Sequence, residues 1–426
     1  MSDYHTMWAD LGLDLKRHDA MLEALPAIYG DLYLSQENRP TGMGYFDFVV
    51  SEIHGARVKE LVDHKAQGGK VIGTFCVYVP EEVIVAADAI GVGLCGGLDL
   101  TVPDGERVLP RNLCPLIKSA FGFKVARMCP YFQACDFVVG ETTCDGKKKA
   151  WELLDGYVPT YVMELPQKKT PQDEAMWLGE VKAFVSQVEE ATGNKITSER
   201  LAQGIARIDA KRAALQRLYD LRKADPVPIS GLDALLAMQI SFYDDPVRFT
   251  EKVNALADEL EEKVRQGEGV KPAGTPRILM AGSPMPIPFW KLHSIVEGSE
   301  AVVVAEESCT GTRYLTGPTE VKVEGEGLEA QLWAIARRQL KTHCACFTPN
   351  TERMEDILRL AREYKADGVI LFSLQFCQPY LVEAVKAEKL LEKEGIPTLR
   401  LETDYSQEDV GQLKTRFEAF LEVIRQ

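Results

Sequence analysis

The sequence predicts an α/β protein with two parallel-sheet α/β domains of similar topology and an intervening helical segment. In both halves of the chain, short apolar runs typical of buried strands alternate with helical stretches. This alternation implies parallel sheets with right-handed crossovers. Between the halves, long helices carry paired charges. We expect a helical extension at residues 1–45, a first α/β domain at 46–170, the helical segment at 171–270 and a second α/β domain at 271–426.

The first half of the chain begins with a helical pattern over about the first 45 residues. A lid and an oligomer contact are the two roles considered for it, and the sequence does not decide between them. Apolar runs with turn residues at their ends then predict strands. These strands are expected at residues 71–79, 92–95, 136–142 and 160–165, with helices at 81–89 and 147–154.

The helical segment starts at the polar stretch PQKKTPQD and ends at a linker, QGEGVKPAGTP, at residues 266–276. Gly and Pro in such stretches interrupt regular structure. Beyond the linker the strand and helix alternation resumes. We expect strands at residues 277–281, 301–306, 368–374 and 398–402, and helices at 352–364 and 379–394.

Composition limits the classes of function. The 426 residues are enough for two or three domains, and a net charge of −15 argues against nucleic acids and anionic membranes as partners. The N-terminal residues lack the apolar core of a signal peptide, so we expect a cytoplasmic protein. Because disulfides are rare in the cytoplasm, ten cysteines point to metal or redox chemistry. The alternative is that many of them are small core residues.

Six of the cysteines fall into two sets of three that lie far apart in the sequence. A [4Fe–4S] cubane is usually held by four thiolates, so three thiolates leave one iron open. The open position can take a substrate, an external ligand or a bridge to a second cluster. The two sets are Cys114, Cys129 and Cys144, and then Cys309, Cys346 and Cys377.

The positions of these cysteines favour a site. Cys144, Cys309 and Cys377 each follow an expected strand, and Cys114 precedes Pro115, which is favoured at the first helical position. The carboxyl ends of parallel strands are where open α/β sheets bind ligands. Helix N-termini at the same edge favour an anion such as a thiolate-bound cluster.

The positions of the other four cysteines do not indicate cluster ligands as clearly. We interpret Cys76, within the run VIGTFCVYV, as a core residue, and expect Cys95 and Cys135 to be structural as well. The run HCACF holds two thiols two residues apart, and both cannot easily reach one cluster. We expect Cys346 to be the ligand and keep Cys344 as the alternative.

Several motifs are absent or out of context. Gly91, Gly93 and Gly96 match G-x-G-x-x-G but straddle a strand, which is not the dinucleotide-binding context. The sequence has no G-x-x-x-x-G-K-[ST] motif, no C-x-x-C-x-x-C run and no pair of C-x-x-C motifs. A P-loop, a ferredoxin-type carrier and a structural zinc site are therefore not indicated.

Five segments together resemble the 2-hydroxyacyl-CoA dehydratase and benzoyl-CoA reductase family: LPRNLCPLIKS, ETTCDGKKK, HCACFTPN, LQFCQPY and LETDYSQEDVGQLKTRFEAF. The resemblance covers residue 71 to the end. It implies a [4Fe–4S] cluster at Cys114, Cys144 and Cys377. The additional Cys129, Cys309 and Cys346 are similar to the double-cubane cluster proteins, in which a sulfide bridges two cubanes. Six thiolates and the bridging sulfide would complete an [8Fe–9S] cluster in the cleft between the two α/β domains.

For function, the resemblance implies a component of an ATP-dependent, low-potential reductase. A separate dimeric iron–sulfur ATPase would supply electrons, ATP would act only through that partner, and a small molecule would be reduced. Homodimerisation is expected by analogy. Two alternatives stay open: a 2-hydroxyacyl-CoA dehydratase subunit with a single [4Fe–4S] cluster, and a non-catalytic redox-sensing iron–sulfur protein.

Protons for a reduction must come from side chains or water, and we expect Glu81, Glu82 and His343 to be the candidates. Each has a structural alternative. Glu81 and Glu82 are also ordinary acids for a helix start, and His343 is either a hydrogen-bond donor to the cluster or a surface residue. Three roles stay open for the lysine run at residues 147–149. The run offsets cluster charge, or it contacts the partner ATPase, or it forms a solvated helix face, which is the more common meaning of such a run.

Overall fold

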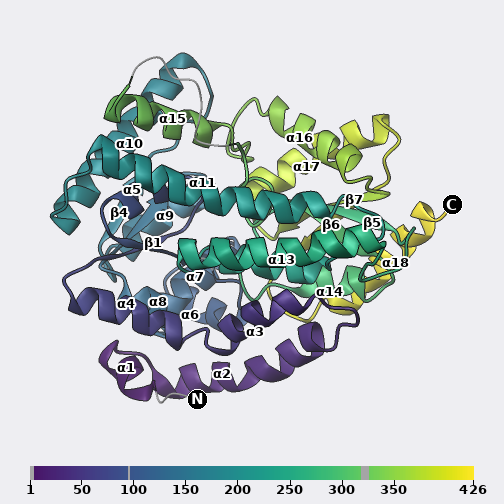
Figure 1. Cartoon of the computed structure of the whole chain (residues 1–426), viewed down its shortest axis with the longest axis horizontal. Coiled ribbons are helices and arrows are strands. Elements are labelled where there is room, and N and C mark those ends of the chain that lie inside the picture. The colour runs from purple at the N-terminus through teal and green to yellow at the C-terminus, as the bar shows by residue number, and fades with distance from the viewer. Residues whose placement is uncertain (1–3, 95, 318–325) are drawn as a thin grey trace.

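The structure, a computed structural model, describes residues 4–94, 96–317 and 326–426 and has two four-stranded parallel sheets (Figure 1). The strand order is β2-β1-β3-β4 in the first sheet and β6-β5-β7-β8 in the second, so the two halves share one topology. This confirms the predicted fold class. The strands are β1 (Val71–Thr74), β2 (Ile90–Gly93), β3 (Phe137–Glu141), β4 (Thr160–Met163), β5 (Arg277–Gly282), β6 (Val302–Glu307), β7 (Gly368–Leu374) and β8 (Thr398–Thr403).

The strands lie where the apolar runs predicted them, with one informative difference at β1. The predicted strand at residues 71–79 ends at Thr74, and the chain then turns, with the Val79 amide donating to the Cys76 carbonyl. Cys76 therefore lies in a turn at the carboxyl end of β1 and not within the strand. The prediction for Cys95 lies outside the described residues.

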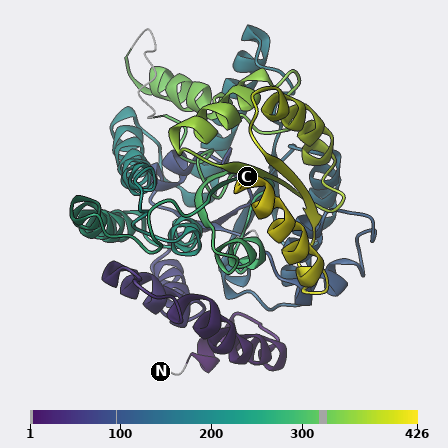
Figure 2. The same cartoon turned by 90° about the vertical axis from the view of Figure 1, so that its right-hand side faces the viewer.

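The N-terminal helices form a layer along one side of the molecule, seen at the bottom of Figures 1 and 2. Asp14 begins the long helix of this layer, where its carboxylate accepts a hydrogen bond from the Arg17 amide, which satisfies one of the free amides of a helix start. The layer contains α1 (His5–Asp10), α2 (Leu15–Tyr29), η1 (Gly30–Leu34), η2 (Thr41–Met43), α3 (Gly44–Ser51) and α4 (Ala56–Ala66).

Helices connect the strands of both sheets, as the crossovers require. In the first half these are α5 (Glu81–Ala86), η3 (Asp99–Thr101), α6 (Val102–Gly105), α7 (Pro115–Val125), α8 (Pro130–Ala134) and α9 (Asp145–Leu154). In the second half they are α14 (Lys291–Glu297), α15 (Leu328–Leu340), α16 (Thr351–Glu363) and α17 (Gln378–Lys393), followed after the last strand by α18 (Val410–Ile424).

The middle segment consists of α10 (Pro171–Thr192), α11 (Ser198–Leu221), α12 (Gly231–Ile240) and α13 (Pro246–Gln266). At the N-cap of each of these helices, a side-chain oxygen accepts a hydrogen bond from a backbone amide of the first turn. The N-cap residues are Thr170, Thr197, Ser230 and Asp245. Helices α11 and α13 lie side by side across the molecule (Figure 1). Helix α12 is buried at every position, so it is part of the hydrophobic core.

Direct hydrogen bonds also join the two halves. The Tyr78 hydroxyl donates to the Thr342 carbonyl, and the Gln339 side-chain amide donates to the Tyr78 carbonyl at 2.7 Å. All three side chains are buried. The loop after β1 is thus fixed to the loop after α15. In the described part of the chain, no helix combines the length and apolarity that a membrane crossing requires.

Candidate functional site: a cavity lined by cysteines

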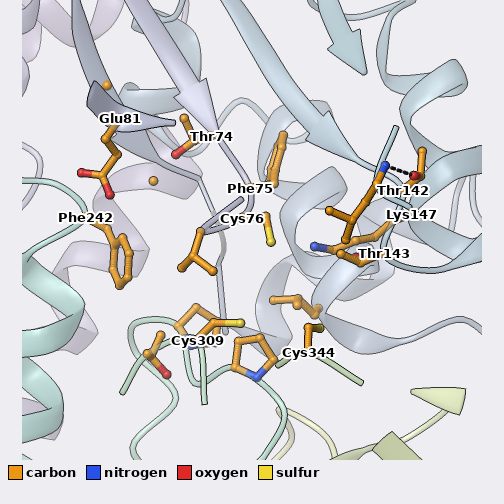
Figure 3. Close-up of a pocket in the computed structure, with 18 of the residues that line it drawn as sticks. Thr74, Phe75, Cys76, Glu81, Thr142, Thr143, Lys147, Phe242, Cys309 and Cys344 are labelled. Atoms are coloured by element: carbon orange, nitrogen blue, oxygen red, sulfur yellow. Dashed lines mark hydrogen bonds between the residues drawn. The ribbon is translucent and has the colours of Figure 1, made fainter. Parts of the chain in front are cut away.

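A cavity of about 1300 Å³ is lined by strand residues of the first sheet and by the loops that follow β5, β6 and β7 of the second. Figure 3 shows Cys76, Cys309 and Cys344 around one part of this cavity, with Glu81 and Phe242 at another. The cysteines that line it are Cys76, Cys114, Cys144, Cys309, Cys344, Cys346 and Cys377. Five of the six predicted ligands are therefore brought to one cavity from segments far apart in the sequence.

Local structure explains how the thiols reach the cavity. Cys144 and Cys377 are the N-cap residues of α9 and α17, directly after β3 and β7, and Cys114 is the N-cap of α7 with Pro115 at the first helical position. Cys309 follows β6 within two residues. Parallel strands end at the same edge of a sheet, so the carboxyl edges of both sheets supply the thiols.

Cys114, Cys144 and Cys377 form a first group, which we call the N-cap set. A hydrogen bond from the Cys377 thiol to Cys114 lowers the pKa of Cys114 and raises that of Cys377. The Cys144 sulfur accepts from the Lys147 amide at 3.4 Å. At Cys144 the helix start thus directs a backbone N–H at sulfur, which opposes the increase that burial gives to the pKa of this thiol.

Cys76, Cys309, Cys344 and Cys346 form a second group, which we call the loop set. Cys76 interacts electrostatically with Cys309 and Cys344. A hydrogen bond from the Cys346 thiol, together with the nearby Arg313 guanidinium, lowers the pKa of Cys344 to about 6 in spite of its burial. Burial raises the pKa of Cys309 to about 11.

The sixth predicted ligand, Cys129, is not among the described residues that line the cavity. It is the N-cap of α8, and burial raises the pKa of its thiol to about 11. Its electrostatic neighbours are Lys124 and Cys135, and the Cys135 thiol donates to the Tyr131 carbonyl at 3.2 Å. Cys129 thus lies at the start of α8, beside Lys124 and Cys135.

The sequence predicts that Cys76 is a core residue, but its side chain lies at the cavity. The apolar run from Val71 to Val79 concealed the end of β1. A signal was present in Pro80, because a proline four residues after the cysteine favours a helix start, and a turn must precede it. Every other cysteine at a strand end in the cavity follows the same order of strand, short loop and helix or turn.

The thiols of the two sets are soft ligands. Among the residues that the structure describes, no three His, Cys, Asp or Glu side chains are close enough to bind a single metal ion, which does not fit a mononuclear zinc site. A cubane spreads its thiolate ligands further apart than one ion does. Seven thiols around one cavity therefore fit an iron–sulfur cluster by ligand type and number.

The three predicted proton donors occupy different environments. Glu81 lines the cavity, and its carboxylate accepts a hydrogen bond from the buried ammonium of Lys211. Glu82 is fully buried and lies 2.7 Å from Arg212; although burial opposes ionisation, Arg212 and Arg338 lower its pKa to about 2. It is thus a structural anion at neutral pH.

His343 precedes the Cys344 loop and is not among the described residues that line the cavity. Its Nδ1 lies 2.6 Å from Asp356 Oδ2 on α16. Of the three candidates, the cavity wall includes Glu81 alone.

The glycines of the rejected dinucleotide motif have a packing role at this cavity. Gly91 and Gly93 line it from β2, and the Gly93 amide donates to the Phe242 carbonyl at 2.8 Å. A Cβ at Gly93 would lie 2.9 Å from the Phe242 Cβ, and one at Gly96 would overlap the Phe123 ring. Glycine is needed because the turn after α12 closes on the strand.

The lysine run divides between the cavity and its rim. Lys147 lines the cavity and donates to the buried carboxylate of Glu141, and its charge counters the pKa increase that burial imposes on Cys144. Lys148 also lines the cavity, but 49% of its side chain is exposed and its ammonium lies 2.9 Å from Asp145, while Lys149 is 64% exposed. Lys147 is therefore the most buried lysine of the run, and it is well placed to offset negative charge inside the cavity.

Comparison with known proteins identifies the family. The family model for the 2-hydroxyglutaryl-CoA dehydratase D-component matches residues 76–424. The chain belongs to this family. The proteins that it is similar to include both dehydratase and reductase subunits.

Three relatives illustrate the range. A protein of Escherichia coli K12, YjiM, provisionally named as a dehydratase subunit, is 36% identical over 85% of this chain and 94% of its own length. The (R)-phenyllactyl-CoA dehydratase beta subunit of Clostridium sporogenes is 27% identical over 86% of this chain and 95% of its own. A benzoyl-CoA reductase subunit of Thauera aromatica is 24% identical over 74% of this chain and 80% of its own.

Proposed function

We propose that this protein is the cluster-bearing component of an ATP-dependent, low-potential reductase. The observation that carries the proposal is the grouping of seven thiols into two sets around one cavity. A single [4Fe–4S] cluster needs at most four cysteine ligands, so the loop set would have no partner. Two cubanes that share a bridging sulfide need three thiolates each, and six thiolates in total.

We assign the six ligands by their positions at the cavity. The N-cap set, Cys114, Cys144 and Cys377, would hold one cubane. From the loop set, Cys76, Cys309 and one thiol of the Cys344–Cys346 pair would hold the other. The location of Cys76 supports it in place of Cys129, which packs beside Lys124. When bound, the cluster would supply low-potential electrons to a small molecule in the cavity.

The remaining partners follow from the family resemblance. The sequence has no P-loop motif, so ATP would act through a separate dimeric iron–sulfur ATPase. The exposed Lys148 and Lys149 beside the cavity suit contact with an acidic partner surface. We further propose that the chain acts as a homodimer, because one chain supplies both thiol sets.

Protons would be held by the ion pair in the cavity wall. Lys211 is buried, with 3% of its side chain exposed, and Glu81 keeps it protonated. Burial disfavours the ammonium, yet the Glu81 carboxylate raises the pKa of Lys211 overall. The pair therefore holds a proton at Lys211 Nζ, and the Glu81 carboxylate, which faces the cavity, is positioned to pass a proton between this ammonium and a molecule bound there.

A dehydratase subunit with a single [4Fe–4S] cluster is the second candidate. It is supported by the names of relatives such as the (R)-phenyllactyl-CoA dehydratase beta subunit. In that case the N-cap set alone would bind iron, and the loop set would be free thiols.

Substitution of single cysteines separates the two candidates. With a double cubane, Cys76→Ser should lower the iron retained after anaerobic purification, while the matched control Cys129→Ser should leave it unchanged. Full iron in Cys76→Ser, Cys309→Ser and the double variant Cys344→Ser/Cys346→Ser would contradict the double cubane and favour the dehydratase. ATP-dependent reduction of a small molecule with an added partner ATPase would then test the activity itself.

A further inference from the structure

Buried polar contacts lead from a guanidinium to one thiol of the loop set. Arg313 donates to the Tyr380 hydroxyl, and the Tyr380 oxygen lies 3.6 Å from the Cys344 sulfur. Tyr380 and Cys344 both line the cavity, and Arg313 and Tyr380 are only 3% and 6% exposed. These contacts are shielded from water, so each hydrogen bond is stronger than at a surface.

The chemistry of the three groups sets the direction of these hydrogen bonds. A guanidinium has donors and no acceptor, so the Tyr380 oxygen accepts from Arg313. The phenol keeps one hydrogen of its own, and the polar atom within reach is the Cys344 sulfur. Tyr380 therefore donates to Cys344.

Arg313 is itself held in place from several sides. It donates to the Gly282 carbonyl and lies 3.1 Å from Glu307, which also binds Arg353 at 2.8 Å. The guanidinium carbons of Arg313 and Arg353 lie 5.1 Å and 5.0 Å from the Tyr380 ring centroid. Glu307 is 1% exposed. The ring thus has one well-defined position, and its hydroxyl stays directed at sulfur.

The two thiols of the HCACF loop differ in this respect. Cys344 is 7% exposed, and its carbonyl accepts from the Asn350 side chain at 3.0 Å and from the Phe347 amide at 3.2 Å. Cys346 is only partly buried. A fixed backbone and a directed donor favour Cys344 as the ligand of the pair.

We propose that Tyr380, held by Arg313, is a positioning residue that raises the reduction potential of the cluster through a hydrogen bond to Cys344. This inference rests on the proposed function, because it requires a cluster bound by the loop set. Reduction adds negative charge to the ligand sulfurs, and a donor stabilises the reduced form more than the oxidised form. Hydrogen bonds to sulfur are a recognised determinant of iron–sulfur potentials.

The test is the midpoint potential of the holoprotein, measured by an anaerobic redox titration followed by electron paramagnetic resonance. Tyr380→Phe removes the hydroxyl and keeps the aromatic ring beside the two arginines. We expect the equilibrium constant for reduction to fall about tenfold, equal to about 59 mV for one electron. The matched control is Tyr131→Phe, since the buried Tyr131 hydroxyl donates to the Ile53 carbonyl at 2.7 Å and not to a thiol; its potential should stay at the wild-type value.

Iron content separates the possible failures. An unchanged potential in Tyr380→Phe with full iron would overturn the inference and leave the proposed function intact. Loss of iron in Tyr380→Phe would also overturn it, because Tyr380 would then hold the ligand instead of tuning it. Wild-type protein with no iron bound by the loop set would overturn the proposed function itself.

Discussion

The buried carboxylate of Glu306 gives a quantitative test of how the second sheet is anchored beside the cavity. Glu306 lies in β6, three residues before Cys309, and is 0% exposed. Arg222, the C-cap residue of α11, donates two hydrogen bonds of 2.8 Å to the Glu306 carboxylate. The Tyr219 hydroxyl donates to the same carboxylate at 2.7 Å, and His293 Nε2 lies 3.0 Å from it. The network joins β6 to the helical segment and to α14.

The magnitude follows from the pKa. Burial opposes ionisation of Glu306, but Arg222 lowers its pKa to about 2. Against an ordinary value near 4.3, at 1.36 kcal/mol for each unit, the charged network contributes about 3 kcal/mol. Glu306→Gln leaves the Arg222 guanidinium buried without its counter-charge, which costs about 3–5 kcal/mol. We therefore expect a loss of at least about 3 kcal/mol in the free energy of unfolding at pH 7.

Urea unfolding of wild type, Glu306→Gln, Arg222→Met and the double variant measures this loss and the coupling between the partners. The double variant should lose much less than the sum of the single losses. A carboxyl with a lowered folded pKa stabilises above its unfolded pKa, so the difference from wild type should shrink as pH falls from about 5 towards 2. The control Glu300→Gln, at a side chain 85% exposed, should change stability by less than about 0.5 kcal/mol. A loss below about 1 kcal/mol for Glu306→Gln, or additive losses, would refute the reasoning.

Two further predictions concern the cavity wall and the N-terminal layer. Gly93→Val should lower the free energy of unfolding by about 1–3 kcal/mol, and with it the melting temperature, because the new Cβ would overlap Phe242. An unchanged melting curve would contradict this prediction and show that the turn after α12 can move to make room. In the N-terminal layer, His18 Nε2 lies 2.9 Å from His54 Nδ1, and burial lowers the pKa of both imidazoles. Because the folded pKa of these imidazoles is lowered, the unfolded state binds more protons as pH falls below the unfolded pKa of about 6.5, and the folded state loses stability. Hydrogen exchange in α2, relative to its intrinsic rate, should therefore be faster at pH 5.5 than at pH 7. Equal protection of α2 at both pH values would contradict a role for the pair.

The fold could be predicted from the sequence because strands and helices are marked by local patterns of apolar and turn residues. Periodicity located the strands of both sheets within a few residues, and the rule that parallel strands end at one edge brought Cys144, Cys309 and Cys377 to the same cavity. A position just after a strand was a better guide to which cysteines line the cavity than the number of cysteines needed to complete each set. Cys129 was grouped by spacing alone, and the structure places it beside Lys124.

The missed features depend on contacts between distant segments. The turn that brings Cys76 to the cavity was concealed because its apolar residues pack as a strand would, with the Phe75 ring stacked on Trp151. The cations that enclose Glu82 come from α11 and α15, and no local pattern around Glu82 reveals them. Likewise, α12 is buried on every side, so it lacks the one-sided periodicity that marks an amphipathic helix.

The central claim, that one chain binds two bridged cubanes between its sheets, is tested most directly by iron and acid-labile sulfide per chain after strictly anaerobic purification. The account predicts about eight irons, with slightly more sulfide than iron. About four irons would contradict it and leave a single cluster on the N-cap set, and no iron would contradict the assignment of the thiol cavity altogether.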